Sequence, residues 1–302
     1  MSVDSGQSRT GNQSPLNERA LHRSAWGRTW RQALAMGRTR VGLTILAFVL
    51  LVAVVGPLVA PRSPNEFAGM PFAKPGNGAF LGTDFLGQDV LSRVLHGGLS
   101  VLWMAVAATG LGVLLGLAVG MAAGYLGGMV DEILMWFSDV VMAFPQIVLA
   151  IVFVSMVGPQ PWLIVIVVAL SHVPRVARLV RSLTQGVARS EYVEAAEAIG
   201  MPTRRIAVRE VLPNLITPLT VESTIRLAWS VAIVAALSFV GFGVQPPIAD
   251  WGLMINENRT GLVVQPLAVL VPMAMVALFA LGASLVGEGF ARTVAGVDRK
   301  GA

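Results

Sequence analysis

Long apolar stretches alternate with shorter polar ones along most of this chain. The run from Val41 to Ala60 carries no charge, and at about 1.5 Å of rise per residue a helix of this length crosses a hydrocarbon layer of about 30 Å. Comparable apolar stretches follow at 99–130, 133–157, 217–244 and 261–287, and a shorter one runs from Trp162 into Arg175, Arg178 and Arg181. The pattern therefore predicts an all-α integral membrane protein with six transmembrane helices.

Composition supports this interpretation. The chain is 55% hydrophobic and only 13% charged, whereas soluble domains average roughly 25% charged residues. The sequence contains no cysteine, which excludes disulfides, thiolate metal sites and cysteine nucleophiles.

The basic residues are distributed unevenly between the polar segments. Segments 1–40, 125–132, 174–214 and 288–302 fall on one side of a six-span topology and hold most of the arginines and lysines. Basic residues favour the cytoplasmic side, so both termini are expected to be cytoplasmic in a bacterial inner membrane. We expect a cytoplasmic tail at 1–40, an uncleaved first span at 41–60, an extracytoplasmic segment at 61–98, a core of five helices at 99–290 and a cytoplasmic tail at 291–302.

Glycines recur at every fourth position in the second apolar stretch. They fall on one helical face and allow a neighbouring helix to approach closely. These residues are Gly112, Gly116, Gly120 and Gly124.

The sequence lacks the residues that several kinds of catalysis need. Neither lysine completes a phosphate-binding G-x-x-x-x-G-K-[ST] loop, and the three histidines show no H-E-x-x-H spacing. We therefore expect no catalytic residue, no metal site and no cofactor on this chain.

Charges inside the spans are costly and are candidates for function. Glu222 and Arg226 are four residues apart on one helix and are expected to pair, most simply as a buried structural pair and alternatively as a lining of the transport pathway. Asp139 lies near the cytoplasmic end of its span, where a solvated or helix-packing role is expected.

The polar loop at 188–213 shows the most specific pattern. Its first part, 189–199, predicts a helix with a narrow apolar stripe formed by Tyr192, Ala195, Ala196 and Ile199 beside an acidic stripe that includes Glu194. Gly200 is expected to end this helix in the left-handed conformation. A second short helix is expected to start at Thr203, to carry Arg204 and Arg205, and to end near Leu212.

Two surfaces could receive this loop. The arginines favour anionic lipid, but glutamates on the first helix would be repelled by it. A groove in a cytoplasmic protein partner would accept the small Ala195 and Ala196 at close range, and we favour that interpretation.

At this loop the sequence resembles a known family. Glu194-Ala-Ala196, Gly200 and Val211-Leu-Pro213 resemble the EAA loop of permease subunits of bacterial ATP-binding cassette (ABC) importers. The segments at 81–93, 123–131 and 250–256 resemble the C-type permease of dipeptide and oligopeptide importers, although Gln88 stands where that family usually has arginine. The likeness covers about 41–289.

The resemblance implies a type I ABC importer fold and several partners. These are a homologous second permease, two cytoplasmic ATPase subunits that bind ATP and Mg, and an extracytoplasmic substrate-binding protein; contact with membrane lipid is expected and contact with nucleic acid is not. The implied cargo is di- or oligopeptides, alternatively a nickel chelate, haem or an antimicrobial peptide. A proton-coupled secondary transporter using Asp139, Glu222 and Arg226 is the rival from another class, and a membrane anchor that scaffolds cytoplasmic proteins is a third interpretation.

Overall fold

The computed structural model describes residues 32–76 and 78–295. Most of the expected N-terminal tail (1–40), and the end of the expected C-terminal tail (291–302), lie outside the described residues. Within the described part the chain is helical, with only isolated bridges between extended residues in one loop, so the predicted all-α fold is confirmed.

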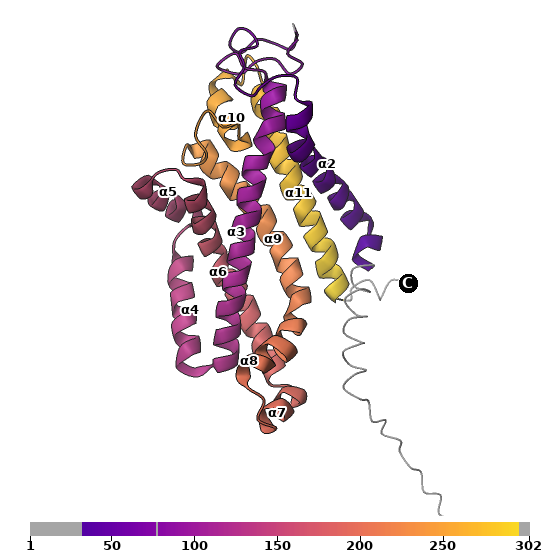
Figure 1. The fold of residues 1–302 in the computed structure, drawn as a ribbon, viewed down its shortest axis with the longest axis vertical. Coiled ribbons are helices and arrows are strands. Elements are labelled where there is room, and N and C mark those ends of the chain that lie inside the picture. The colour runs from indigo at the N-terminus through magenta and orange to yellow at the C-terminus, as the bar shows by residue number, and fades with distance from the viewer. Residues whose placement is uncertain (1–31, 77, 296–302) are drawn as a thin grey trace, which may run out of the picture.

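The helices form an elongated bundle with short elements at its two ends (Figure 1). In chain order the elements are α2 (Gly37–Val59), α3 (Val90–Leu126), α4 (Gly128–Ala143), α5 (Gln146–Val157), α6 (Pro161–Ala188), α7 (Glu191–Ala198), α8 (Thr203–Ile206), a π-helical turn (Ala207–Val211), α9 (Leu212–Val240), α10 (Trp251–Asn258), a 3-10 turn (Arg259–Gly261) and α11 (Leu267–Ala295).

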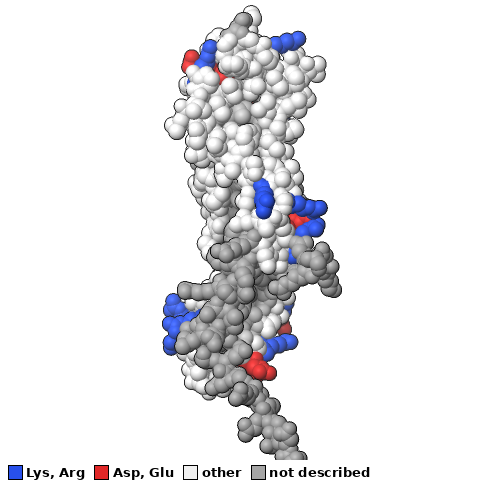
Figure 2. All heavy atoms as spheres, turned by 90° about the vertical axis from the view of Figure 1, so that its right-hand side faces the viewer, with Lys and Arg blue, Asp and Glu red and all other residues white. Residues whose placement is uncertain are grey.

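Five segments of the described chain are long and apolar enough to cross a membrane, and a sixth crossing results if α4 and α5 together form one span. The five are α2, α3, α6, the continuous run Thr203–Val240 and α11 up to Thr293. Figure 2 shows the face that carries α2 and α11, where a tall surface without charged side chains separates the charges at one end from those farther down. Such a surface suits contact with lipid.

The third predicted span is not one straight helix. The residues predicted to form it, 133–157, fall in two helices, because α4 ends at Ala143 and α5 leaves at an angle of 84° to it. Phe144 is extended at this break, with ψ of 133°. The cause is Pro145, which has no N–H to donate and disfavours the helical conformation at the residue before it.

Two other boundaries differ from the sequence prediction. Helix α3 begins at Val90 rather than Leu99, with the Asp89 carboxylate accepting a hydrogen bond from the backbone N–H of Ser92 at its start. Helix α6 continues to Ala188, beyond the predicted apolar stretch, so Arg175, Arg178 and Arg181 lie in the second half of one regular helix.

The glycine stripe packs α3 against α6, as its spacing predicts. A Cβ atom added at Gly116 would lie 2.6 Å from Cβ of Val176, and one added at Gly120 would lie 2.5 Å from the carbonyl oxygen of Ala177. Only glycine permits this backbone separation.

Candidate functional site

The loop at 188–213 lies at one end of the bundle, and α7 lies beyond the ends of α6 and α9 (Figure 1). Helix α7 is attached through its own apolar residues. Val193 and Ala196 are buried in a cluster with Val180 of α6, Ile206 of α8 and Leu215 of α9. The helix is therefore fixed to the two long helices that enter and leave the loop.

The predicted apolar stripe is divided by this packing. Ala196 is only 8% exposed and faces the chain's own core, while Tyr192, Ala195 and Ile199 are exposed, Ile199 to 78%. Glu194 is exposed beside them. The sequence pattern did not separate these faces, because Val193, the residue that anchors the helix, lies outside the predicted stripe.

Gly200 ends α7 as predicted. Its φ is +78°, its N–H donates to the carbonyl oxygen of Glu197 at 2.9 Å, and the N–H of Met201 donates to that of Ala196 at 3.1 Å. The chain reverses here into α8, whose Arg204 and Arg205 side chains are exposed.

The second helix of the loop does not end near Leu212, so that expectation is wrong. The chain passes from α8 through the π-helical turn into α9, and Thr203–Val240 is one helical run. Pro213 is the second residue of α9 and directly follows the π-helical turn, so the helical run continues through the proline. The loop therefore joins α9 without a flexible break.

Inside the bundle, Glu222 and Arg226 form an ion pair with 2.8 Å between Oε1 and Nε, and both side chains are largely buried. Farther along α9, the Ser230 hydroxyl forms two hydrogen bonds, one with the Thr109 hydroxyl of α3 and one with Nε2 of His172 on α6, each at 2.8 Å. Sequence reasoning missed His172 and Ser230, because single polar residues in an apolar span carry no recognisable spacing.

Helix α4 is tied to α6 by two ion pairs. Asp139 pairs with Arg178, and Asp131 pairs with Arg181. The helix-packing role expected for Asp139 is consistent with this contact.

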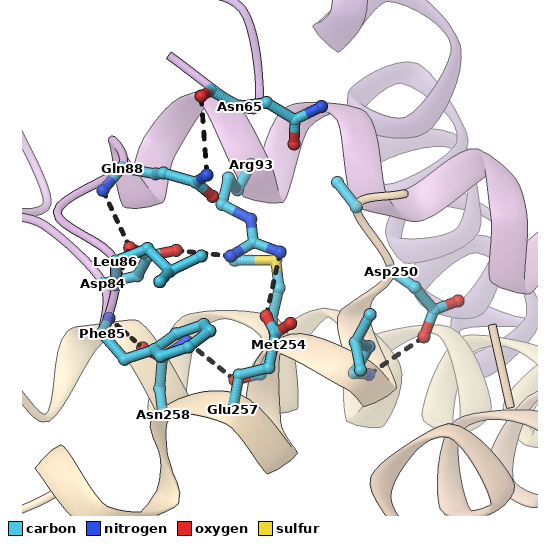
Figure 3. Close-up of polar contacts among 12 residues, drawn as sticks. Asn65, Asp84, Phe85, Leu86, Gln88, Arg93, Asp250, Met254, Glu257 and Asn258 are labelled. Carbon is cyan, nitrogen blue, oxygen red and sulfur yellow. Dashed lines mark hydrogen bonds and ion pairs between the residues drawn. The ribbon is translucent and has the colours of Figure 1, made fainter. Parts of the chain in front are cut away.

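At the opposite end of the bundle, residues 61–89 and α10 form a cap over the ends of the long helices (Figure 1). Figure 3 shows its polar centre, where the buried Arg93 guanidinium lies between the carboxylates of Asp84 and Glu257. Asn258 accepts a hydrogen bond from the Phe85 N–H at 3.0 Å. Burial raises the pKa of the Glu257 carboxyl although Arg93 opposes the rise.

The cap also explains why Gln88 replaces a usual arginine without loss of the local turn. The backbone N–H groups of Gln88 and Leu86 both donate to one carboxylate oxygen of Asp84, so the turn depends on main-chain groups. The Gln88 amide donates outward to the carbonyl oxygen of Asn65 at 3.5 Å (Figure 3).

No group of three or more acidic or histidine side chains within residues 32–76 and 78–295 could hold a metal ion.

Comparisons with known proteins agree with this arrangement. Residues 112–295 match the family described as the binding-protein-dependent transport system inner membrane component, and residues 24–75 match the N-terminal TM domain of oligopeptide transport permease C. The first match includes α6 to α11 and the whole loop at 188–213.

Several full-length relatives are similar to this chain. A dipeptide transport system permease protein of Alkalihalophilus pseudofirmus is 31% identical, with 92% of each chain covered. A glutathione transport system permease protein of Escherichia coli is 34% identical, with 92% of each chain covered. The protein of the same description from Pectobacterium atrosepticum is 33% identical, over 88% of this chain and 89% of the relative. The chain is thus a multi-pass inner-membrane permease subunit and belongs to the family of binding-protein-dependent transport system inner membrane components.

Proposed function

We propose that this chain forms half of a peptide import pathway and that the loop at 188–213 transmits movement from cytoplasmic ATPases to it. The observation that carries the proposal is the two-sided packing of α7. Val193 and Ala196 fix the helix to α6 and α9, whereas Ala195 and Ile199 are left exposed; Tyr192 is exposed as well, and its hydroxyl accepts a hydrogen bond from the Asn214 amide of α9 at 3.2 Å. An exposed apolar face beside acidic residues suits a protein groove better than an anionic membrane surface.

The proposed complex contains a homologous second permease, two ATPase subunits and an extracytoplasmic substrate-binding protein. ATP and Mg are bound by the ATPases, and this chain contributes no catalytic group. Both termini and α7 lie on the cytoplasmic side, because most basic residues lie in the segments on that side. Movement of the ATPases would then displace α7 together with α6 and α9 as one packed unit.

Peptides are the proposed cargo. The relatives named above include a dipeptide and two glutathione transport permeases, and glutathione is itself a small peptide. The other cargoes that the sequence leaves open have no comparable support among these relatives.

The test is purification of the complex from native membranes through a tag on this chain, identification of its subunits, and reconstitution into vesicles. Two ATPases, a second permease and ATP-dependent peptide uptake with added binding protein are expected. Uptake driven by a proton gradient without ATP would overturn the proposal in favour of a secondary transporter.

Ala195 allows a sharper test of coupling. Ala195→Arg is expected to leave the permease pair intact but to reduce ATPase retention and uptake together. Arg204→Ala on the same loop is expected to have a milder effect, because a single exposed charge contributes about 1 kcal/mol or less. Normal uptake by a well-expressed Ala195→Arg complex would show that α7 does not transmit the movement.

A further inference from the structure

Three arginines of α6 are spaced three residues apart, and two of them have carboxylate partners on α4. Arg181 pairs with Asp131 and Arg178 pairs with Asp139. The third, Arg175, lies halfway along α6 and has no carboxylate within ion-pair distance in the described part of the chain. The row of pairs stops there because the last turn of α4, residues 140–143, carries no acidic side chain.

A cavity of about 240 Å³ lies at this point. It is lined by Arg175 and Ser171 of α6, by Gln146 and Leu149 of α5, by Phe144 and Pro145 at the helix break, and by Val141, Met142 and Ala143 at the end of α4. The Gln146 amide donates a hydrogen bond to the Ser171 hydroxyl, so polar groups from both α5 and α6 line one wall. The Arg175 side chain is exposed.

The electrostatic environment of the cavity is positive. An arginine halfway along a membrane-spanning helix carries an insertion cost of roughly 2.5 to 3.5 kcal/mol, and such residues usually face a polar cavity or a partner. Helix α5 begins at Gln146 without a side-chain cap, so its unpaired N–H groups add a partial positive charge at the same wall. The other charged pair within the bundle, Glu222 and Arg226, is already neutralised internally.

We propose that this cavity binds the carboxylate of the transported peptide, with Arg175 as the residue that recognises it. The inference rests on the proposed function as a peptide importer. A guanidinium can donate two parallel hydrogen bonds to one carboxylate, a geometry that a lysine cannot reproduce. The volume is below the roughly 300 to 1,000 Å³ of pockets that enclose a whole small ligand, so the cavity suits the end of a peptide.

The break between α4 and α5 gives the site its shape. The 84° bend between α4 and α5 places Pro145, Gln146 and Leu149 in the wall of the cavity that Arg175 also lines. Discontinuous membrane helices commonly place helix ends and unpaired polar groups beside a transported ion or substrate.

The experiment uses the reconstituted complex with its binding protein and two probes, trialanine and trialanine amide, which differ only in the terminal carboxylate. Binding of both probes to the isolated binding protein is measured separately, so that its own selectivity can be removed from the comparison. For Arg175→Gln, uptake of trialanine is expected to fall about tenfold or more, because a hydrogen-bonded charge pair is lost. Uptake of the amide is expected to change by less than about twofold.

Arg178→Gln is the matched control, one turn along the same helix and paired with Asp139. It is expected to leave the ratio of acid to amide uptake unchanged, because this pair is exposed and an exposed ion pair contributes little. Arg175→Lys is expected to assemble and to give an intermediate ratio, since the charge remains without the paired donors.

Equal loss of both probes in Arg175→Gln, or no loss of either, would overturn the carboxylate site. Loss of assembly in both Arg175→Gln and Arg175→Lys would also overturn it, in favour of an ion pair with the second permease. If the unmodified complex takes up neither probe, the proposed function as a peptide importer is contradicted. The carboxylate site, which rests on that function, is then contradicted as well.

Discussion

Ala195 and Ala196 are adjacent on α7 but face opposite surroundings. Ala196 is packed against Val193 and the core formed by α6, α8 and α9, whereas Ala195 is exposed on the other side of the helix. The same substitution at the two positions therefore separates folding of this chain from binding of a partner.

Ala196→Arg is expected to destabilise the purified chain by roughly 3 kcal/mol or more, because it places an unpaired charge in an apolar cluster. Ala195→Arg is expected to leave the melting temperature of the purified chain in detergent nearly unchanged. Equal melting temperatures for the two variants would contradict the packing described for α7.

Gly200 is expected to tolerate alanine poorly for a backbone reason alone. Its φ is +78°, yet a Cβ atom there would meet no other atom within 4 Å. Gly200→Ala should therefore cost about 1 kcal/mol of unfolding free energy through the left-handed conformation. Gly186 on α6 also has open space around it but no positive φ, so Gly186→Ala should be neutral or stabilising when both are measured by thermal unfolding.

The contact between α3 and α6 predicts a contrast between two glycines of one helix. Gly116→Ala places a methyl group 2.6 Å from Cβ of Val176 and should cost about 1 to 3 kcal/mol through forced repacking. Gly110→Ala meets nothing within 4 Å and should leave stability unchanged or slightly raised. Chemical unfolding in mixed micelles compares the two, and equal effects would count against the close helix contact.

The pair formed by Glu222 and Arg226 predicts non-additive substitutions. Either Glu222→Leu or Arg226→Leu alone leaves an uncompensated charge among buried groups and should lower the yield of folded protein strongly. The double variant should recover most of that yield, as monitored by size-exclusion chromatography. A double variant that folds but does not transport would place the pair on the pathway.

Glu257 predicts a pH dependence of stability. Burial raises the pKa of this carboxyl above its ordinary value of 4.5, so the folded chain holds the proton more strongly than the unfolded chain. The associated stabilisation is present below pH 4.5 and is lost as pH rises through the raised pKa. Melting temperatures at about pH 5 and about pH 7.5 should differ less in Glu257→Gln, which stays neutral throughout; an unchanged difference would contradict this assignment.

Much of the fold follows from apolar run length, because crossing a membrane demands a fixed length of uncharged helix. The start of α3 could not be predicted in this way. In the sequence, the charge of Arg93 indicates a polar segment outside the membrane helix. In the folded chain, that charge is neutralised by two carboxylates, Asp84 from the loop before α3 and Glu257 from α10. Such pairing depends on contacts between distant segments that run length does not record.

The candidate site was predictable in position but not in orientation. Spacing located α7 and its glycine end, because both depend on local backbone preferences. Which face of α7 is covered depends on Ile206 and Leu215, residues that return to the helix after the turn. The cavity that Arg175 lines could not be predicted either, because it depends on the bend at Pro145, which brings residues of α4, α5 and α6 together.

The uninterrupted helical run from Thr203 to Val240 has a mechanical consequence. Its 38 residues span about 57 Å at 1.5 Å per residue, more than the thickness of the hydrocarbon layer. Such a rod acts as a lever: a tilt of about 5° at the end that carries α7 displaces the far end by roughly 5 Å, about one helical pitch. If α7 transmits movement as proposed, a small motion imposed at its end of the helix would thereby reach the other end, beside α10 and the cap.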